Sequence, residues 1–222
     1  MKDSTLLFFP ALYLLIPASY LIGSIPFGLL LTRNKGVDIR TTGSKNIGAT
    51  NVLRTVGKMP ALLTLLGDML KGFMPVLICN HIIAGKIPAE NSILFHNIKD
   101  LWGGLAGLAA IAGHIFSIFL SFKGGKGVAT GLGVLAAYSP VCAIITLFVW
   151  IAVAVITRYS SLAAIAAVGV LPITFALLDF SKIKIIFAIL FAILIISRHK
   201  ENIKRLIEGK ESKIGKKGIR DM

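Results

Sequence analysis

Two lysines are set among glycines in the segment SFKGGKGVATG, residues 121–131, and residues of these types at this spacing could do chemistry. Glycines let backbone N–H groups approach an oxyanion, and the start of a helix favours negative charge. The segment therefore predicts a nest for phosphate around the ammonium of Lys126, formed by Gly124, Gly125 and Gly127. It is not a Walker A loop, because glycine follows Lys126 where Ser or Thr should hold magnesium. A lysine anchor at a membrane surface is the alternative, and Lys123 fits that alternative better.

A second polar stretch, TTGSKNIGATNVLRT at residues 41–55, interleaves small residues with hydroxyls and amides. Its candidate ligands for an oxyanion are Gly43, Ser44, Asn46, Gly48, Thr50 and Asn51. Such residues offer neutral hydrogen bonds, and Arg54 adds a charged, bidentate group. The alternative is a glycine-rich turn that begins a helix, with Thr50 or Asn51 as its cap.

Two shorter stretches add further candidates. Ser160 and Ser161 lie where an apolar run begins, so either could bind a ligand or cap a helix. His199 and Asn202 lie one helical turn apart on one face, just beyond the last apolar run; solvated polar residues at the membrane interface are the alternative.

Several familiar catalytic patterns are absent from the sequence. It has no Gly-x-Ser-x-Gly elbow, no His-x4-Asp pair and no metal-binding cluster, so no metal or cofactor is expected. Asp68 and Lys71, at i and i+3 within an apolar run, are expected to pair with each other for structural reasons. Cys79 and Cys142 are expected to be buried thiols.

The composition predicts the setting of these residues. The chain has 222 residues, 55% of them hydrophobic, and a formal net charge of +14. Apolar runs of about 17 to 25 residues are long enough to cross a bilayer. The sequence therefore predicts a polytopic membrane protein whose positive charge faces anionic lipid headgroups, and no nucleic-acid partner. The first apolar run continues past the small residues that resemble a signal-peptide cleavage site, so we expect it to be a retained span.

The predicted fold is all-α with seven transmembrane helices. The expected spans are at about 6–32, 59–84, 101–121, 127–138, 140–156, 161–178 and 183–197. Loop 33–58 carries six Lys or Arg against Asp38, and the tail 198–222 carries nine Lys or Arg against four acidic residues. Cytoplasmic segments are enriched in Lys and Arg, so both should face the cytoplasm, with loop 85–100 and the N-terminus outside.

This orientation requires an odd number of spans, which splits the long run 127–156 at Ser139-Pro140. The resulting fourth span has about 12 residues and a length of about 18 Å, so its glycines should pack closely against neighbouring helices. We expect one domain over residues 1–222. Its basic tail at about 198–222 should begin as an amphipathic helix and lose regular structure after Gly209.

Four segments, in this order and spacing, resemble the bacterial acyl-phosphate:glycerol-3-phosphate acyltransferases, the PlsY family. The segments are GSKNIGATNVLRTVGK, GHIFSIFLSFKGGKGVATGLGV, RYSSLAAI and RHKENIKRLIEGKE. The resemblance runs from about residue 20 to residue 215, and it implies seven membrane helices with the active site on the cytoplasmic side of the bacterial inner membrane.

The resemblance also implies a reaction. The sn-1 hydroxyl of glycerol 3-phosphate would attack a long-chain acyl phosphate, giving 1-acyl-glycerol 3-phosphate (lysophosphatidic acid) and phosphate, as the first acylation step of phospholipid biosynthesis. A partner enzyme that makes the acyl phosphate is expected. The implied catalytic residues are Ser44, Arg54, Lys126, Ser161, His199 and Asn202. Family members can carry a further serine where this chain has Ala164, and a small residue, often glycine, where it has Lys45.

An acyl phosphate is a mixed anhydride, so no covalent nucleophile on the protein is needed. The family is thought to use a substrate phosphate as the base, and His199 is the lesser candidate for this role because the pKa of imidazole can fall near working pH. Two other classes remain. A transporter would place its site near the midplane between repeats, and a lipid-binding scaffold would leave the glycine-rich segments unexplained.

Overall fold

The computed structural model describes residues 10–85 and 92–215, which form helices and short 3-10 turns without any strand. The N-terminal half contains α1 (Pro10–Ser24), α2 (Phe27–Thr32), η2 (Arg33–Lys35), α3 (Ala49–Thr55), α4 (Lys58–Ala84) and α5 (Ser92–Ile115). The C-terminal half contains η3 (Ile118–Leu120), α6 (Val128–Tyr138), α7 (Pro140–Thr157), α8 (Ser160–Gly169), α9 (Leu171–Leu178), α10 (Lys182–Ser197) and α11 (Lys200–Ile207).

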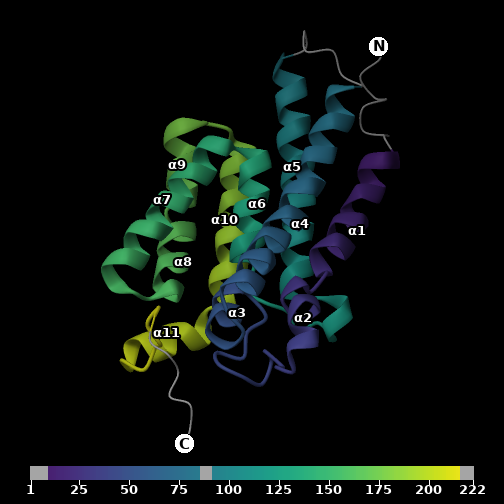
Figure 1. Cartoon of the computed structure of the whole chain (residues 1–222). Coiled ribbons are helices and arrows are strands. Elements are labelled where there is room, and N and C mark those ends of the chain that lie inside the picture. Colours follow the sequence, from purple (N-terminus) through teal and green to yellow (C-terminus); the bar gives the residue numbers. More distant parts are fainter. Residues whose placement is uncertain (1–9, 86–91, 216–222) are drawn as a thin grey trace, which may run out of the picture.

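The long helices form two groups joined by a central pair. Helices α1, α4 and α5 pack together on one side, α7, α8 and α9 lie on the other, and α6 and α10 stand between them (Figure 1). The short helices α2, α3 and α11 gather at one end of the bundle, which Figure 1 shows at the bottom. The polar stretches that contain most of the predicted site residues therefore meet at one end.

Among residues 10–85 and 92–215, five segments are long and apolar enough to cross a membrane. They are Pro10–Lys35, Lys58–Ala84, Ile93–Leu120, Pro140–Thr157 and Ser160–Leu178. Two further helices coincide with predicted spans but are shorter, α6 with 11 residues and α10 with 16. Large apolar side chains such as Leu14, Ile144 and Phe148 are about 70% exposed on the outside of the bundle, as expected for a surface covered by lipid tails.

The predicted break at Ser139-Pro140 is confirmed. Helix α6 ends at Tyr138, Ser139 is extended with φ −156° and ψ 92°, and α7 begins at Pro140. Proline disfavours helical dihedrals in the preceding residue and suits the first turn of a helix. The sequence therefore turns one apolar run into two helices that pack against each other.

Glycines allow the short helix α6 to pack closely on α4, as expected. A Cβ at Gly133 would collide with the carbonyl of Met69, and one at Gly72 would collide with the carbonyl of Thr130. Only a residue without a side chain fits where two helix backbones come this close.

Some predicted boundaries are wrong. The first span is interrupted between Ser24 and Phe27, where Pro26 cannot continue the hydrogen-bond ladder, and its expected start at residue 6 lies outside the described residues. Helix α5 begins at Ser92 rather than near residue 101, so the polar residues 96–100 are helical. The span predicted at 161–178 agrees with the apolar segment Ser160–Leu178, although a break inside it ends α8 at Gly169 and begins α9 at Leu171, next to Pro172.

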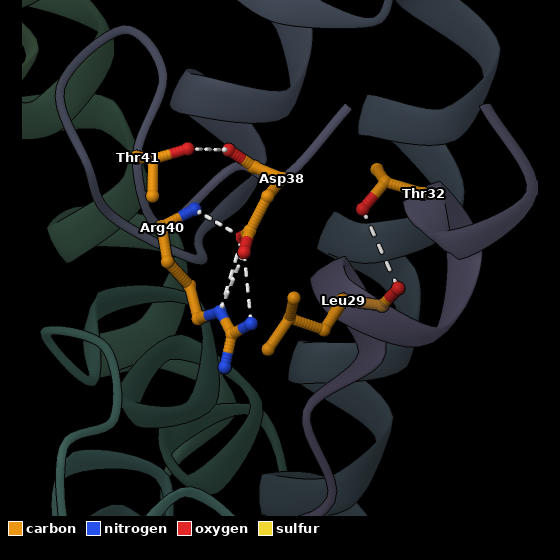
Figure 2. Close-up of polar contacts among 5 residues, drawn as sticks. All are labelled: Leu29, Thr32, Asp38, Arg40 and Thr41. Atoms are coloured by element: carbon orange, nitrogen blue, oxygen red, sulfur yellow. Dashed lines mark hydrogen bonds and ion pairs between the residues drawn. The ribbon is translucent and has the colours of Figure 1, made fainter. Parts of the chain in front are cut away.

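The loop between α2 and α3 neutralises one of its own cations. The Arg40 guanidinium forms an ion pair with Asp38 at 2.8 Å, and the Thr41 hydroxyl donates to the Asp38 carbonyl at 3.0 Å (Figure 2). Both charged side chains lie at the surface, so Arg40 does not reach the interior; Arg54 belongs to the helix that follows, α3.

The tail has the expected secondary structure. Helix α11 is present, and residues 210–215 have no regular secondary structure. The chain turns at Gly209, with φ +66°, and the residues that follow contact Arg54 and Arg158. Residues 216–222, which contain the remaining basic residues of the tail, lie outside the described part.

Candidate active site

A cavity of about 590 Å³ begins at the end of the bundle where α3 and α11 meet and extends between the long helices. Its polar part is lined by the six predicted catalytic residues, Ser44, Arg54, Lys126, Ser161, His199 and Asn202. Its deeper part is lined by apolar residues that include Leu65, Leu132, Leu135, Leu147, Trp150 and Leu171. Segments that are far apart in the sequence thus share one space with a charged mouth and an apolar interior.

The eight residues predicted to bind phosphate divide into two groups. Asn46, Gly48, Thr50 and Asn51 line the cavity, whereas Gly43, Gly124, Gly125 and Gly127 are absent from its wall. The hydrogen bonds of these residues explain the difference.

Asn51 holds the loop before α3 and does not present its amide to a ligand. The Asn51 Nδ2 donates to the carbonyls of Ile39, Thr42 and Asn46 at 2.8 to 3.1 Å, and its Oδ1 accepts from the Ser44 N–H at 2.8 Å. Because these bonds use both protons of a side chain that is 1% exposed, the prediction that Asn51 binds phosphate is wrong. Its role is to position Ser44.

The loop that Asn51 holds has two residues with left-handed backbone, Gly43 with φ +65° and Lys45 with φ +56°. Gly43 packs against the Asn51 side chain, where a Cβ would collide with Oδ1, so it shapes the loop rather than the wall of the cavity. A small residue such as glycine would fit better at position 45, because a left-handed conformation costs an L-residue about 1 kcal/mol or more. The helix that follows begins at Ala49 with Gly48 as its N-cap, so neither Thr50 nor Asn51 is the cap.

The N–H groups of Gly124 and Gly125 do not form a phosphate nest. They donate to the carbonyls of Ile115 and His114, each at 3.0 Å, and so dock the loop onto the end of α5. A Cβ at either glycine would collide with the His114 residue. These glycines are needed for close approach of two segments, and Gly127, with φ +84°, is the N-cap from which α6 begins.

The docked loop places Lys126 in the cavity. Burial lowers the pKa of its ammonium to about 8; Glu211 opposes this shift, while Arg205, Arg54 and Arg198 add to it. Lys126 and the half-buried Arg54 thus make the mouth of the cavity strongly positive at neutral pH.

His199 is buried and uncharged at neutral pH. Its Nδ1 lies 2.8 Å from the Ile195 carbonyl, and its exposed fraction is 2%. Burial lowers the pKa of the imidazole to about 4, with the charge of Lys126 as a further cause in the same direction. The expectation that this pKa lies near working pH is therefore wrong. With Nδ1 donating to the carbonyl, Nε2 is left as a hydrogen-bond acceptor.

A carboxylate that the sequence analysis did not select lies beside these residues. Glu211 accepts hydrogen bonds from the Ser161 hydroxyl, the Asn202 amide and the Arg205 guanidinium, each at 2.7 Å. These bonds lower the pKa of the carboxyl against the opposing effect of burial. Ser161 is consequently held by Glu211 and does not cap α8, whose N-cap is Tyr159. Glu211 belongs to the segment RHKENIKRLIEGKE, but only its place in the fold distinguishes it from Glu201 and Glu208.

Within α4, Asp68 and Lys71 form the expected ion pair, with Asp68 Oδ1 and Lys71 Nζ 2.7 Å apart. Lys71 also donates to the Ile25 carbonyl at 2.7 Å, and His114 Nδ1 lies 3.5 Å from Asp68. All three side chains are less than 5% exposed, so the cluster supports the break in the first span and the end of α5.

Cys79 and Cys142 are buried free thiols, as predicted. Within residues 10–85 and 92–215, His, Cys, Asp and Glu nowhere gather in a group of three that could hold a metal ion.

The chain is similar to one family over nearly its whole length. The family model described as glycerol-3-phosphate acyltransferase matches residues 13–209. The glycerol-3-phosphate acyltransferase of Geotalea daltonii is 44% identical over 198 residues, covering 89% of this chain and 95% of the relative. That of Mesorhizobium japonicum is 47% identical over 208 residues, covering 93% and 98%.

Two solved structures of PlsY, an integral membrane glycerol 3-phosphate acyltransferase, share the fold. The glycerol 3-phosphate form gives a TM-score of 0.80 and the lysophosphatidic acid form 0.78, both at 39% identity. Each comparison covers 92% of this chain and 96% of the PlsY chain.

Proposed function

Because this chain belongs to the glycerol-3-phosphate acyltransferase family, we propose that it transfers the acyl group of a long-chain acyl phosphate to the sn-1 hydroxyl of glycerol 3-phosphate. The products are 1-acyl-glycerol 3-phosphate and inorganic phosphate. The observation that carries this proposal is the cavity, whose positive mouth at Arg54 and Lys126 continues into an apolar interior. This shape and charge suit two phosphates and one acyl chain.

The first task of the site is to bring two phosphate-bearing substrates together against their mutual repulsion. Arg54 can bind a phosphate oxygen pair, and Lys126 adds a point charge in a half-buried place where charges are weakly screened. Holding the hydroxyl next to the acyl carbonyl supplies much of the rate enhancement that a reaction without a protein nucleophile requires.

In the chemical step, the sn-1 oxygen attacks the acyl carbon and the bond from that carbon to the phosphate oxygen breaks. The hydroxyl proton passes to a phosphate oxygen of a substrate, and the inorganic phosphate leaves. No covalent acyl-enzyme forms. His199 is a poor general base because its pKa is about 4, so its part is to orient a hydroxyl through Nε2.

The apolar interior of the cavity receives the acyl chain. Its lining reaches from Ser161 to Leu171 along α8 and the start of α9, about 15 Å at the helical rise of 1.5 Å per residue. Leu62 on α4 and Leu147 on α7 line the cavity and are more than 40% exposed. The proposed route for a lipid-borne donor is sideways from the bilayer, between these two helices.

The proposed topology has seven crossings in the bacterial inner membrane, with the N-terminus outside and the cavity mouth and α11 in the cytoplasm. The positive charge of the loop before α3 and of the tail supports this orientation. A cysteine introduced at exposed Asn34 should resist an impermeant maleimide in intact cells, whereas one at exposed Lys182 should react. The opposite pattern would refute the orientation.

A substitution pair in the GGKG loop tests the proposed function. Lys126→Ala should reduce lysophosphatidic acid formation from glycerol 3-phosphate and palmitoyl phosphate at least about a hundredfold, because a charge on a phosphate is lost. Lys123→Ala is the matched control: it removes the same charge from the same loop at an exposed position, and activity should stay within about twofold. Equal activity of both variants would contradict the assignment of the phosphate site.

A further inference from the structure

The segment after α11, residues 208–215, folds back over the cavity, and we call it the C-terminal strap. The Ile214 N–H donates to the Arg158 carbonyl at 2.7 Å, and Arg158 Nη2 donates to the Ile214 carbonyl at 3.0 Å. Arg54 Nη2 donates to the Ser212 carbonyl at 3.4 Å. The strap is therefore held by the turn between α7 and α8 and by α3, and it carries Glu211 into the cavity wall.

The carboxylate of Glu211 connects the strap to two predicted catalytic residues. One oxygen, Oε1, accepts from Ser161 and Asn202, and the other, Oε2, accepts from Arg205, all at 2.7 Å. The Glu211 side chain is 7% exposed, and residues Ser161 and Asn202 are 6% and 4% exposed. Hydrogen bonds to a buried carboxylate are strong and directional, so these contacts fix where the protons point.

The consequence for Ser161 follows from the chemistry of a hydroxyl, which has one proton and two lone pairs. The proton of Ser161 is committed to Glu211, so only lone pairs face the cavity. The phosphate of a monoester, as a dianion, offers acceptors and no proton, whereas the hydroxyls of a glycerol moiety can donate. Asn202 differs, because its second amide proton remains free for an anion.

We propose that Glu211 is a positioning residue that makes Ser161 an acceptor for a hydroxyl of glycerol 3-phosphate rather than a donor to phosphate. This inference rests on the proposed function for the identity of the ligand. It gives Ser161 the task of distinguishing glycerol 3-phosphate from a phosphate monoester without a hydroxyl, such as methyl phosphate, while Lys126 and Arg54 bind the phosphate that both ligands share.

A competing role for Glu211 is that of a tethered anion that occupies the phosphate position until substrate displaces it. The hydrogen bonds favour positioning, because the carboxylate is satisfied by Ser161, Asn202 and Arg205, while Lys126 and Arg54 make no hydrogen bond to it among the described contacts. The cations most suited to phosphate are thus left for a substrate.

Binding measured by calorimetry with purified protein tests the role of Ser161 without turnover. We expect Ser161→Ala to weaken binding of glycerol 3-phosphate about three- to tenfold, the effect of one lost hydrogen bond, and to leave binding of methyl phosphate unchanged. Lys126→Ala should weaken binding of both ligands. If Ser161→Ala weakened binding of both ligands equally, the inference would be overturned. It would also be overturned if the wild-type protein bound glycerol 3-phosphate no more tightly than methyl phosphate.

Glu211→Gln tests the positioning step, with Glu208→Gln as its control on the same strap. Glu208 pairs with exposed Lys210 at 3.1 Å, so its replacement should leave both affinities unchanged. Glu211→Gln should weaken binding of glycerol 3-phosphate by about as much as Ser161→Ala does. Because both substitutions remove the same interaction, the double variant should bind glycerol 3-phosphate less than about threefold more weakly than either single variant. Independent effects of the two substitutions in the double variant, or tighter binding of methyl phosphate by Glu211→Gln, would overturn the inference.

Melting temperatures of all variants separate loss of binding from loss of folding. If Glu211→Gln does not fold, Ser161→Ala still tests whether Ser161 binds a hydroxyl of glycerol 3-phosphate, because this substitution removes a single oxygen atom. Wild-type turnover with palmitoyl phosphate is measured separately. Absence of turnover in a protein that still distinguishes the two ligands through Ser161 would refute the proposed function and leave the role of Ser161 standing.

Discussion

The proposed binding of phosphate by Lys126 requires a charged ammonium, yet burial disfavours charge at this position. Burial lowers the pKa of its ammonium to about 8, while the Glu211 carboxylate nearby works in the opposite direction. The free enzyme therefore loses this cation only slightly above neutral pH. Lysine is the natural residue for this site if binding of a dianion restores the charge, whereas arginine would stay charged throughout.

This pKa predicts the alkaline limb of the pH profile. Lys126 is charged below its pKa and neutral above it, so kcat/KM for glycerol 3-phosphate should fall as the pH rises through about 8. Steady-state rates with palmitoyl phosphate between about pH 6 and pH 10 measure the effect. Lys126→Arg should lower the plateau but remove the limb, because guanidinium stays charged. A limb that persists unchanged in this variant would exclude Lys126 as its source.

Lys45 offers a separate test of the loop before α3. Its side chain is exposed and its φ is +56°, so Lys45→Gly should remove backbone strain and stabilise the protein by about 0.5 to 1 kcal/mol. Thermal unfolding in detergent measures this change. Lys45→Ala keeps the Cβ and should bring no gain. If alanine stabilised as much as glycine, loss of the lysine charge rather than relief of strain would be the cause.

For individual residues, the sequence predicted which side chains share a cavity better than it predicted the role of each side chain. Residue types and segment order were enough to bring Ser44, Lys126 and His199 together. They could not reveal that the Asn51 amide donates to three carbonyls of the loop, or that Glu211, in the tail, accepts a hydrogen bond from Ser161. Both facts depend on hydrogen bonds between segments whose approach is set by the packed helices.

The GGKG loop shows how an element positions a residue. Its glycines were predicted to offer N–H groups to phosphate, but Gly124 and Gly125 donate to α5. Composition could not distinguish a nest from a docking site, because both need backbone without a Cβ. The outcome for Lys126 is the same, since the loop projects it into the cavity.

Gly125→Ala tests this docking. The added methyl group would collide with the His114 ring, so the loop must shift and Lys126 with it. A displacement of about 1 Å lowers activity about a hundredfold in a well-oriented site, and we expect a loss in kcat/KM of this order. Gly169→Ala is the control, because a Cβ there meets open space at the end of α8. Full activity of Gly125→Ala would contradict the docking role.

Some helix boundaries have a local cause in the sequence, and others depend on contacts between distant segments. The break at Pro140 was predictable, because proline acts on its own neighbours. The break at Ile25-Pro26 also has a local cause in Pro26, but it was missed because the apolar run continues through it. The structure stabilises this break further with Lys71, which donates to the Ile25 carbonyl from another helix. The early start of α5 at Ser92 was missed because its first turns carry polar residues.

In the whole molecule, the polar segments that contain the candidate site residues lie at one end of an apolar helix bundle. Each of the four polar segments is separated from the next by membrane-length helices, and the distribution of Lys and Arg was sufficient to predict that they share a side. The apolar part of the cavity was not predictable, because Leu132 on α6 and Leu171 on α9 have the same character as residues that face lipid. Only the packing of α6 between the two helix groups separates an internal cleft from the outer surface.

The most direct test of the central claim is the choice of acyl donor by the purified protein. Glycerol 3-phosphate is supplied with palmitoyl phosphate in one sample and with palmitoyl-CoA in another, and lysophosphatidic acid is quantified by mass spectrometry. We predict product from the acyl phosphate alone, because the cavity has cations for a second small phosphate beside that of glycerol 3-phosphate. Product from palmitoyl-CoA alone, or no product from either donor with folded protein, would contradict the account.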